Sequence, residues 1–452
     1  MNSIRPYAAL AAAALLSACG TVGRAADAVW PFSGGSSNTQ TAPEEGRISI
    51  LTFEQRLTPD PQLAARPIVV AAPNVGEDWS QPGGNAHNAP INVQGAGNLT
   101  VERRFSLGAG SNDRVRLAAP PIILNGSLYF LDADHHVRAF DASSGSERWN
   151  TRLRPEESRD RVALGGGITS GDGRIYATTG FGFAVALDAQ TGAEIWRTRV
   201  NAPFHTAPTF AGGRVFAVTN DSELVAMDAA TGAVQWTHQA IAEPARIRSS
   251  SSPAVAGDTV IAPFASGEII GLLAANGRRL WVDALTRAGR LTSLSAINDI
   301  AGRPVIDNGV IYAASHSGVL AAIDLRSGQR IWSISFASTQ TPWISGDVVY
   351  AVTVDGELAA LDRTNGSVYW VRQLRRFEEE DERRGRIAWT GPIMAGGRLI
   401  LANSIGEVAA VNPANGEIVQ SADVDQPVFI PPIASNGAIY VVTDDARAVV
   451  MR

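Results

Sequence analysis

The chain carries a single cysteine, Cys19, and no lysine. One thiol excludes an intramolecular disulfide, a thiolate metal cluster and a Cys-x-x-Cys redox pair. The absence of lysine excludes a Schiff-base enzyme and a phosphate loop of the Walker type. The basic residues, all arginine, number 38 against 44 acidic residues, so the net charge is −6. Because no strong positive field results, we expect no nucleic-acid partner.

Histidines are also few, and none has the spacing of metal ligands. The six are scattered through the chain, at His87, His135, His136, His205, His238 and His316. The two adjacent ones would point to opposite faces of a strand. No Gly-x-Ser-x-Gly motif occurs either. We therefore expect no metal site and no catalytic residues.

The N-terminus has the layout of a secretory signal, with Arg5 followed by an apolar stretch at 8–16 that is too short to span a bilayer permanently. The sequence LSAC that ends at Cys19 resembles the bacterial lipobox. The resemblance implies that residues 1–18 are removed as a signal peptide and that Cys19 is acylated, which would anchor the chain in a membrane. Gly20, rather than Asp, after the cysteine implies the periplasmic leaflet of the outer membrane. The alternative is a chance cysteine after an ordinary signal peptide.

Residues 19–75 are rich in Ala, Gly, Ser, Thr and Pro, which predicts a lipidated N-terminus followed by a flexible tether. Within it, residues 47–57 (RISILTFEQRL) are more apolar. They could form a short strand or helix that docks on a partner, or could be ordered only transiently.

A repeat fills the rest of the chain and ends each time in an Asp-x-x-Thr-Gly-x-x-x-Trp element. Copies read DASSGSERW, DAQTGAEIW, DAATGAVQW, DLRSGQRIW and DRTNGSVYW, with the weaker LAANGRRLW and NPANGEIVQ. The tryptophans are Trp149, Trp196, Trp236, Trp281, Trp332 and Trp370. They lie 38 to 51 residues apart, close to the about 40 to 50 residues of a propeller blade. Each unit has room for four short strands, so the fold class is all-β.

An eighth unit begins at Pro431 but ends with the chain before a fourth strand. Residues 99–106 can supply that strand and close the ring. The sequence therefore predicts an eight-bladed β-propeller of four-stranded antiparallel blades over residues 76–452, with closure between N- and C-terminal strands.

The repeated residues have structural roles in this prediction. Asp and Thr can bond backbone amides of a tight hairpin in which Gly takes a left-handed conformation. The following Trp would dock one blade against the next. This element resembles the tryptophan-docking motif of the pyrroloquinoline-quinone (PQQ) family of propellers, including WSQPGGN at 79–85.

That resemblance leaves a PQQ-dependent periplasmic dehydrogenase as one alternative. Such enzymes resemble one another in having two adjacent cysteines over the quinone and a calcium held by Glu, Asn and Asp. A single cysteine cannot supply the pair, and the chain is shorter than those enzymes. We therefore expect no cofactor and no enzyme activity.

A lipobox, a tether and a propeller together resemble the BamB family of outer-membrane assembly lipoproteins. The resemblance implies a scaffold of the β-barrel assembly (BAM) complex that binds periplasmic POTRA domains of BamA and assists unfolded outer-membrane proteins. In that family a leucine-arginine segment before the fourth blade and a D-x-D segment before the fifth bind BamA. Ile247 and Arg248 match the first segment, with Ala245 at its other apolar position. Asp299 matches the first acid of the second segment, and Ala301 replaces the other acid.

A run of mixed charge, RRFEEEDERRGR, occupies residues 375–386 between the sixth and seventh units. We expect it to be a solvated loop. Exposed strand edges on the propeller rim offer a second kind of contact, in which an unfolded chain adds a strand.

Overall fold

In the computed structural model the chain divides after Arg56, and the strands described below lie in the unit Leu57–Arg452. The residues described are 57–63, 66–74, 78–90, 92–153, 155, 163–243, 246–247, 251–286 and 297–452. The predicted signal peptide, Cys19, Arg248 and residues 19–56 of the predicted tether lie outside them.

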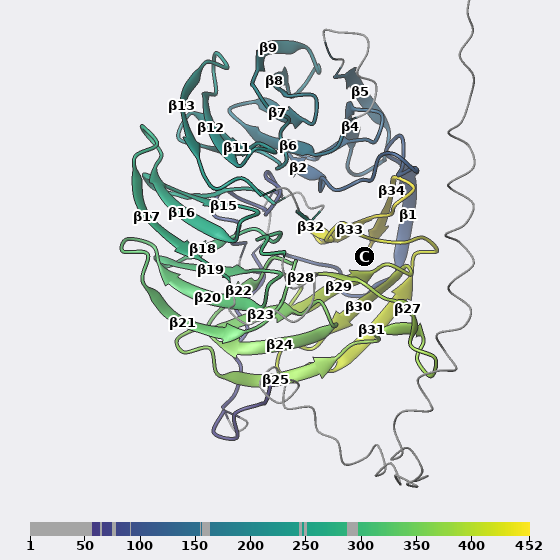
Figure 1. Cartoon of the computed structure of the whole chain (residues 1–452). Helices are drawn as coiled ribbons and strands as arrows, with labels where there is room; N and C mark the ends of the chain where they lie inside the picture. The colour runs from purple at the N-terminus through teal and green to yellow at the C-terminus, as the bar shows by residue number, and fades with distance from the viewer. Residues whose placement is uncertain are drawn as a thin grey trace, which may run out of the picture. The chain divides into compact units, whose positions relative to one another are not determined.

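Eight four-stranded antiparallel sheets make up this unit and surround a common centre (Figure 1). Blade 1 comprises β2 (Ile122–Leu124), β3 (Ser127–Leu131), β4 (His136–Asp141) and β5 (Glu147–Arg152), and blade 2 comprises β6 (Gly166–Gly171), β7 (Arg174–Thr179), β8 (Phe183–Asp188) and β9 (Glu194–Arg199). Blade 3 comprises β10 (Thr209–Ala211), β11 (Arg214–Val218), β12 (Glu223–Asp228) and β13 (Val234–Gln239), and blade 4 comprises β14 (Ala254–Ala256), β15 (Thr259–Pro263), β16 (Glu268–Leu273) and β17 (Arg279–Ala284). Blade 5 comprises β18 (Val305–Asp307), β19 (Val310–Ala314), β20 (Val319–Asp324) and β21 (Arg330–Ser335), and blade 6 comprises β22 (Trp343–Ser345), β23 (Val348–Val352), β24 (Glu357–Asp362) and β25 (Val368–Gln373). Blade 7 comprises β28 (Trp389–Ala395), β29 (Arg398–Asn403), β30 (Glu407–Val411) and β31 (Ile418–Asp423), and blade 8 comprises β32 (Ile433–Ser435), β33 (Ala438–Val442), β34 (Arg447–Met451) and β1 (Val101–Ser106).

Blade 8 closes the ring with strands from both ends of the unit. Its strand order is β1-β34-β33-β32, and Phe105 pairs with Ala448 in the register of β1 and β34. Closure removes an otherwise open sheet edge. The predicted eight-bladed propeller with terminal strand closure is confirmed.

Strand position within a blade explains the hydrophobic pattern of each repeat. The second and third strands are covered on both faces by neighbouring blades, and β15 and β23 are accordingly buried at every position. The outermost strands have exposed and half-buried positions, as β5 and β13 show. Each repeat therefore reads as apolar runs followed by a more polar strand.

The Asp-x-x-Thr-Gly turn of blade 3 shows how these hairpins are made. Asp228 Oδ1 accepts hydrogen bonds from the backbone N and the hydroxyl of Thr231, both 2.9 Å long. These bonds hold the pKa of Asp228 below its usual range. Gly232 follows at φ 78°, a conformation that side chains other than hydrogen disfavour.

Six indoles join successive blades. Each tryptophan lies on an outermost strand and its Nε1 donates to a backbone carbonyl in the hairpin of the next blade. The pairs are Trp149 to Ala189, Trp196 to Ala229, Trp236 to Ala274, Trp281 to Leu325, Trp332 to Arg363 and Trp370 to Pro413, at 2.9 to 3.1 Å. The turn glycine of the next blade lies against the indole, and a Cβ on Gly328 would come within 2.5 Å of Trp281.

The two remaining interfaces use other residues. Gln420 stands where blade 7 lacks its tryptophan, and its Oε1 accepts a hydrogen bond of 3.1 Å from the backbone N of Leu99. Between blades 8 and 1, Phe105 takes the corresponding place. A Cβ on Gly145 would come within 2.7 Å of its ring. Because blade 8 combines both ends of the chain, the interface between blades 7 and 8 lacks the standard hairpin. The interface between blades 8 and 1 keeps the hairpin of blade 1 and lacks only the tryptophan.

Residues 78–90 plug one end of the central channel. Their backbone carbonyls accept bonds from inner-strand amides of four blades. The pairs are Ile123 to Trp79, Ser170 to Ser80, Val255 to Ala86 and Ile306 to His87, at 2.8 to 3.0 Å. Gln81 contacts blade 3 as well, because its Nε2 donates a hydrogen bond of 2.9 Å to the backbone carbonyl of Phe210. The ring of Trp79 stacks on that of Trp343 in blade 6, with centroids 6.2 Å apart.

The described part of the segment before this plug also packs on the propeller. The backbone N of Asp60 donates to the carbonyl of Val368 on β25 at 2.8 Å. Arg66 bonds the Asp362 carboxylate at 3.1 Å. The compact unit thus starts at residue 57, upstream of the expected domain boundary at residue 76.

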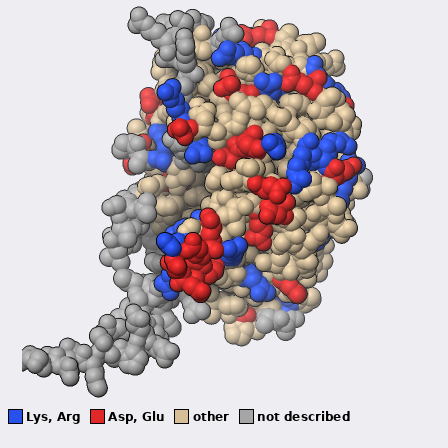
Figure 2. Space-filling model, turned by 90° about the vertical axis from the view of Figure 1, so that its right-hand side faces the viewer, with Lys and Arg blue, Asp and Glu red and all other residues tan. Residues whose placement is uncertain are grey.

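The mixed-charge run contains a short hairpin, β26 (Phe377–Glu379) and β27 (Arg384–Arg386), where we expected a loop. Ion pairs explain the difference, because Arg386 and Arg376 bond Asp355 at 2.6 and 3.1 Å and fix the hairpin to blade 6. Figure 2 shows basic and acidic surfaces adjoining one another on one side of the molecule.

Candidate functional site

The two faces of the propeller differ in how the chain crosses them. Because the strands of a blade alternate in direction, the turn between its second and third strands lies on the same face as the connection from its outermost strand to the next blade. We call this the connection face. The opposite face carries the tight inner turns and the Asp-x-x-Thr-Gly hairpins, and it is the end of the channel that residues 78–90 approach. Long connections on a rigid scaffold commonly carry function, so we expect the functional surface on the connection face.

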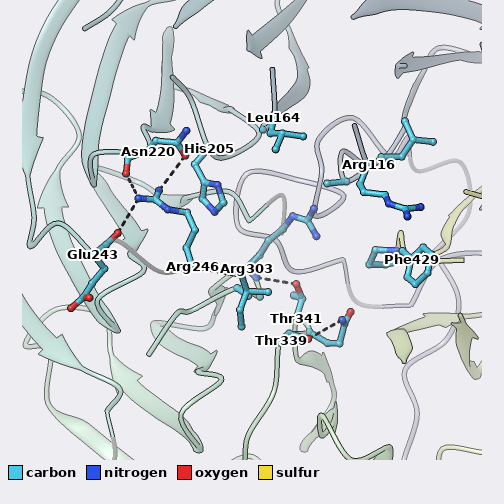
Figure 3. A pocket seen from close by; sticks show the side chains of 18 of the residues that line it. Arg116, Leu164, His205, Asn220, Glu243, Arg246, Arg303, Thr339, Thr341 and Phe429 are labelled. Atoms are coloured by element: carbon cyan, nitrogen blue, oxygen red, sulfur yellow. Dashed lines mark hydrogen bonds between the residues drawn. The ribbon is translucent and has the colours of Figure 1, made fainter. Parts of the chain in front are cut away.

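A cavity of about 1220 Å³ opens on the connection face at the central channel (Figure 3). Its lining comes from connections and turns of seven of the eight blades. It consists of Arg116, Leu117, Ala118, Leu164, Gly165, His205, Asn220, Asp221, Ala242, Glu243, Arg246, Ile247, Ala301, Gly302, Arg303, Thr339, Gln340, Thr341, Phe429, Pro431 and Asp444. The predicted contact residue Ile247 is one of them.

Ile247 and Asp299 are brought together at this cavity, although 52 positions separate them. The backbone N of Ile247 donates to Asp299 Oδ2 at 2.7 Å. The Asp299 side chain is almost fully buried, at 3% exposure, and burial raises its pKa. A carboxylate in that position fixes the connection before blade 4, while the half-buried Ile247 side chain lines the cavity.

Arg246 precedes Ile247 and bonds the second-to-third-strand turn of blade 3. Its guanidinium donates to the backbone carbonyl of Asn220, to Asn220 Oδ1 at 3.2 Å and to the backbone carbonyl of Glu243 at 3.2 Å. These acceptors are uncharged and orient the guanidinium. The charge of Arg246 also acts on the buried Asp299 carboxylate, where it opposes the rise in pKa that burial causes.

Arg303 and His205 lie deeper in the cavity. Arg303 is 8% exposed and burial lowers its pKa to about 10, so it stays protonated at neutral pH. Its backbone N donates to Thr341 Oγ1 at 3.0 Å. Burial and the charge of Arg246 lower the pKa of His205 to about 4, so its imidazole is neutral. Within the described residues, the buried His205 Nε2 has no hydrogen-bond partner.

No sequence motif marks Arg246, His205 or Arg303 as site residues. One signal could have found Arg303. In seven blades a proline opens the inner strand. The residue before that proline is uncharged in six of these blades, whereas in blade 5 it is Arg303. The six are Pro120, Ala207, Ser252, Thr341, Gly391 and Pro431. Since the repeat places this position at the channel, a charged side chain there points to a use other than blade packing.

Metal-binding clusters and membrane-spanning helices are absent from the described part of the chain. Over these residues, no group of three or more His, Cys, Asp or Glu side chains lies close enough to hold a metal ion. Likewise, no helix in this part is long and apolar enough to cross a membrane.

Fold and site together define a class of protein, the closed eight-bladed propeller with tryptophan-docked blades and a plugged channel. The model of the family described as outer membrane protein assembly factor BamB matches residues 133–372 and 374–451. The chain belongs to the BamB family. The family membership predicted from the sequence is therefore confirmed.

Individual relatives agree with this assignment. The chain is 27% identical to outer membrane protein assembly factor BamB of Salmonella typhimurium over 329 residues, which are 72% of this chain and 82% of the relative. It is 26% identical to BamB of Moranella endobia over 71% and 81% of the two chains. The crystal structure of BamB from Moraxella catarrhalis superposes with a TM-score of 0.65 at 23% identity, over 78% and 99% of the chains. A europium-containing methanol dehydrogenase reaches a TM-score of 0.66 at 14% identity, over 81% and 89%, and shares the fold.

Proposed function

We propose that this chain is a non-catalytic scaffold of the BAM complex that binds a POTRA domain of BamA with the connection face of its propeller. The observation that carries the proposal is the junction of Ile247 and Asp299 at the mouth of the central cavity. These residues come from the two connections that bind BamA in the BamB family.

The junction has the properties of a prepared contact. The Asp299 carboxylate accepts a hydrogen bond from the backbone N of Ile247, so the connection is already held before a partner binds. Preorganisation of this kind lowers the entropy lost on binding. The aliphatic side chain of Ile247 then offers an apolar anchor, and the adjacent Arg248 is proposed as the charged contact. In this proposal Asp299 acts by positioning Ile247.

The same proposal places the chain in the outer membrane, attached to the periplasmic leaflet by acyl chains on Cys19. It also includes contact with unfolded outer-membrane proteins at the rim. Outermost strands of five blades present exposed aliphatic side chains, at Ile195, Val234, Leu280, Val282, Ile331, Ile418 and Val419. Such edges can accept an added strand.

The alternative, a PQQ-dependent dehydrogenase, has less support. The likeness to the methanol dehydrogenase is one of fold, at 14% identity. A single cysteine cannot make the disulfide expected over the quinone.

A pull-down of the periplasmic part of BamA with the acylated full-length chain tests the BamA contact. We expect Arg248→Glu and Asp299→Arg to lower the apparent affinity at least about tenfold. Asp299→Asn keeps an oxygen for the Ile247 amide, so its binding should stay close to that of the parent. A direct charge contact by Asp299 would instead make Asp299→Asn weaken binding as well, by less than Asp299→Arg.

Matched controls lie on the opposite face. Arg326→Glu and Asp258→Arg make the same charge changes at exposed positions of a hairpin and an inner turn, and both should bind like the parent. Full binding by Arg248→Glu and by Asp299→Arg would reject these contacts. Titration with PQQ and calcium tests the alternative, which saturable binding without BamA association would favour.

A further inference from the structure

The central cavity contains hydrogen-bond donors that the BamA contact at Ile247 does not use. Its volume of about 1220 Å³ exceeds the range of about 300 to 1,000 Å³ that is usual for small-molecule pockets. The plug at residues 78–90 lies beyond a second, much smaller cavity of about 30 Å³, which Arg303, Gln340 and Thr341 also line. An occupant must therefore enter from the connection face.

Two arginines and a histidine face this space from successive connections. Figure 3 shows the Arg303 side chain extending into the hollow, with Arg246 and His205 beside each other on one wall. Arg246 is oriented by uncharged oxygens of Asn220 and Glu243. The buried Nε2 of His205 has no partner within the described residues and can donate to an incoming oxygen.

The carboxylates that line the cavity are engaged or peripheral. Asp444 pairs with Arg116 at 3.1 Å. Asp221 is exposed at the rim. Glu243 meets Arg246 through its backbone carbonyl, and Figure 3 shows its side chain directed away from that guanidinium. Among the described residues, the inner wall therefore has two guanidinium groups, Arg246 and Arg303, and one buried carboxylate, Asp299, which holds the Ile247 amide.

The rim is apolar by contrast. Phe429 is 49% exposed and Leu164 40% exposed, and the half-buried Ile247 lies in the connection from blade 3 to blade 4. A ligand that suits both regions has a carboxylate at its tip and apolar groups on either side.

We propose that the cavity receives an acidic segment of a partner protein, whose Asp or Glu side chain enters between Arg303 and Arg246 while its apolar neighbours pack on Phe429, Leu164 and Ile247. Guanidinium groups bind carboxylates through charge-assisted hydrogen bonds. The large volume favours a peptide segment over a small anion. This inference deepens the proposed function and rests on it for the identity of the partner.

Short peptides test the inference directly. The probes are a blocked pentapeptide Gly-Leu-Glu-Leu-Gly and its Gln counterpart, titrated by calorimetry into the full-length chain. We expect the Glu peptide to bind at least about tenfold more tightly than the Gln peptide. Arg303→Met should weaken the Glu peptide at least about tenfold, and its fold should persist because Met replaces a buried charge with a similar volume.

Arg116→Met is the matched control, since Arg116 lines the same cavity at an exposed position and pairs with Asp444. It should change affinity less than about twofold. Arg246→Gln keeps a donor for Asn220 and should weaken the Glu peptide. A nuclear magnetic resonance signal of His205, assigned with His205→Gln, should shift on addition of the Glu peptide while that of the exposed His87 in the plug stays in place. Equal binding of the two peptides, an unchanged affinity in Arg303→Met, or tighter binding of citrate than of the Glu peptide would overturn the inference.

The BamA fragment separates this inference from the proposed function. Equal binding of the fragment by the parent and Arg303→Met would overturn the inference and leave the BamA contact standing. Failure of the fragment to bind either, with peptide discrimination intact, would overturn the BamA contact and support an acidic segment from another protein.

Discussion

His205 illustrates how a single side chain links the cavity to the stability of the propeller. It lies in the connection to blade 3, where its backbone N donates to Val218 at 2.9 Å. Its imidazole is held among buried groups beside the Arg246 charge, which is why the pKa falls from 6.5 to about 4. Protonation of His205 must therefore oppose folding.

The sign of the pH effect follows from these two values. Above pH 6.5 the imidazole is neutral in both the folded and the unfolded chain, so His205 has no effect on the free energy of unfolding there. As the pH falls from 6.5 toward 4 the unfolded chain binds the proton first, and stability is lost. The loss at pH 5 is about 2 kcal/mol. Urea unfolding at pH 7.5 and 5 should show this loss in the parent and a smaller one in His205→Gln.

His135 and His238 also have lowered pKa values because of burial, and they titrate in both proteins. The comparison therefore isolates His205. An equal acid-induced loss in His205→Gln would show that the His205 imidazole does not contribute.

Individual site residues were predictable only where a local pattern marked them. Ile247 and Asp299, which stay predicted contact residues, were singled out because a family segment fixes their distance from the prolines that open blades 4 and 5. Arg246 and His205 gave no such signal, because the direction of a side chain in an irregular connection depends on turns of another blade, here Asn220. For Arg303, the repeat predicts a position at the channel, but the burial of the side chain could not be predicted from the sequence.

At the scale of the element, the blade interface is the repeated unit of stability. Trp281 is 8% exposed, packs against Gly328 and donates to Leu325 at 3.0 Å. Trp281 contributes to the stability of the propeller through burial of its apolar ring together with a hydrogen bond across the interface.

Trp281→Ala should lower the free energy of unfolding by about 3 to 5 kcal/mol, because it opens a cavity between blades 4 and 5. Ile331→Ala, on the outermost strand of blade 5 at 50% exposure, should change it by less than about 0.5 kcal/mol. Urea denaturation followed by circular dichroism gives both values. Similar midpoints for the two variants would mean that the indole is not what joins these blades.

The blades were the most predictable feature, because each repeat combines a period, a turn sequence and a Trp that agree with one another. The exceptions were harder. In the sequence Gln420 merely replaces the tryptophan of the repeat. Only the closed ring shows that its side chain accepts a hydrogen bond from the backbone N of Leu99. The charged sequence of β26 and β27 did not predict a hairpin, because the ion pairs that fix it are made to Asp355 of the neighbouring blade.

At the scale of the whole molecule, the plug joins blades that are distant in sequence. Residues 78–90 bond inner strands of blades 1, 2, 3, 4 and 5, and Trp79 stacks on blade 6. Their sequence resembled part of the propeller family, but no local pattern could place them across the channel, since their partners are backbone groups. Because these bonds span most of the ring, the plug should stabilise the propeller as one unit and not a single blade.

Trp79→Ala tests that reasoning. The side chain is 3% exposed, so its loss should cost about 3 to 5 kcal/mol, as for other buried aromatic residues. If the plug acts on the whole ring, tryptophan fluorescence and far-ultraviolet circular dichroism should report one transition with the same lowered midpoint. Val69→Ala, at 75% exposure in the preceding segment, should leave the midpoint unchanged. Two separated transitions in Trp79→Ala would show instead that the plug secures only the blades it touches most closely, and that the ring can open without it.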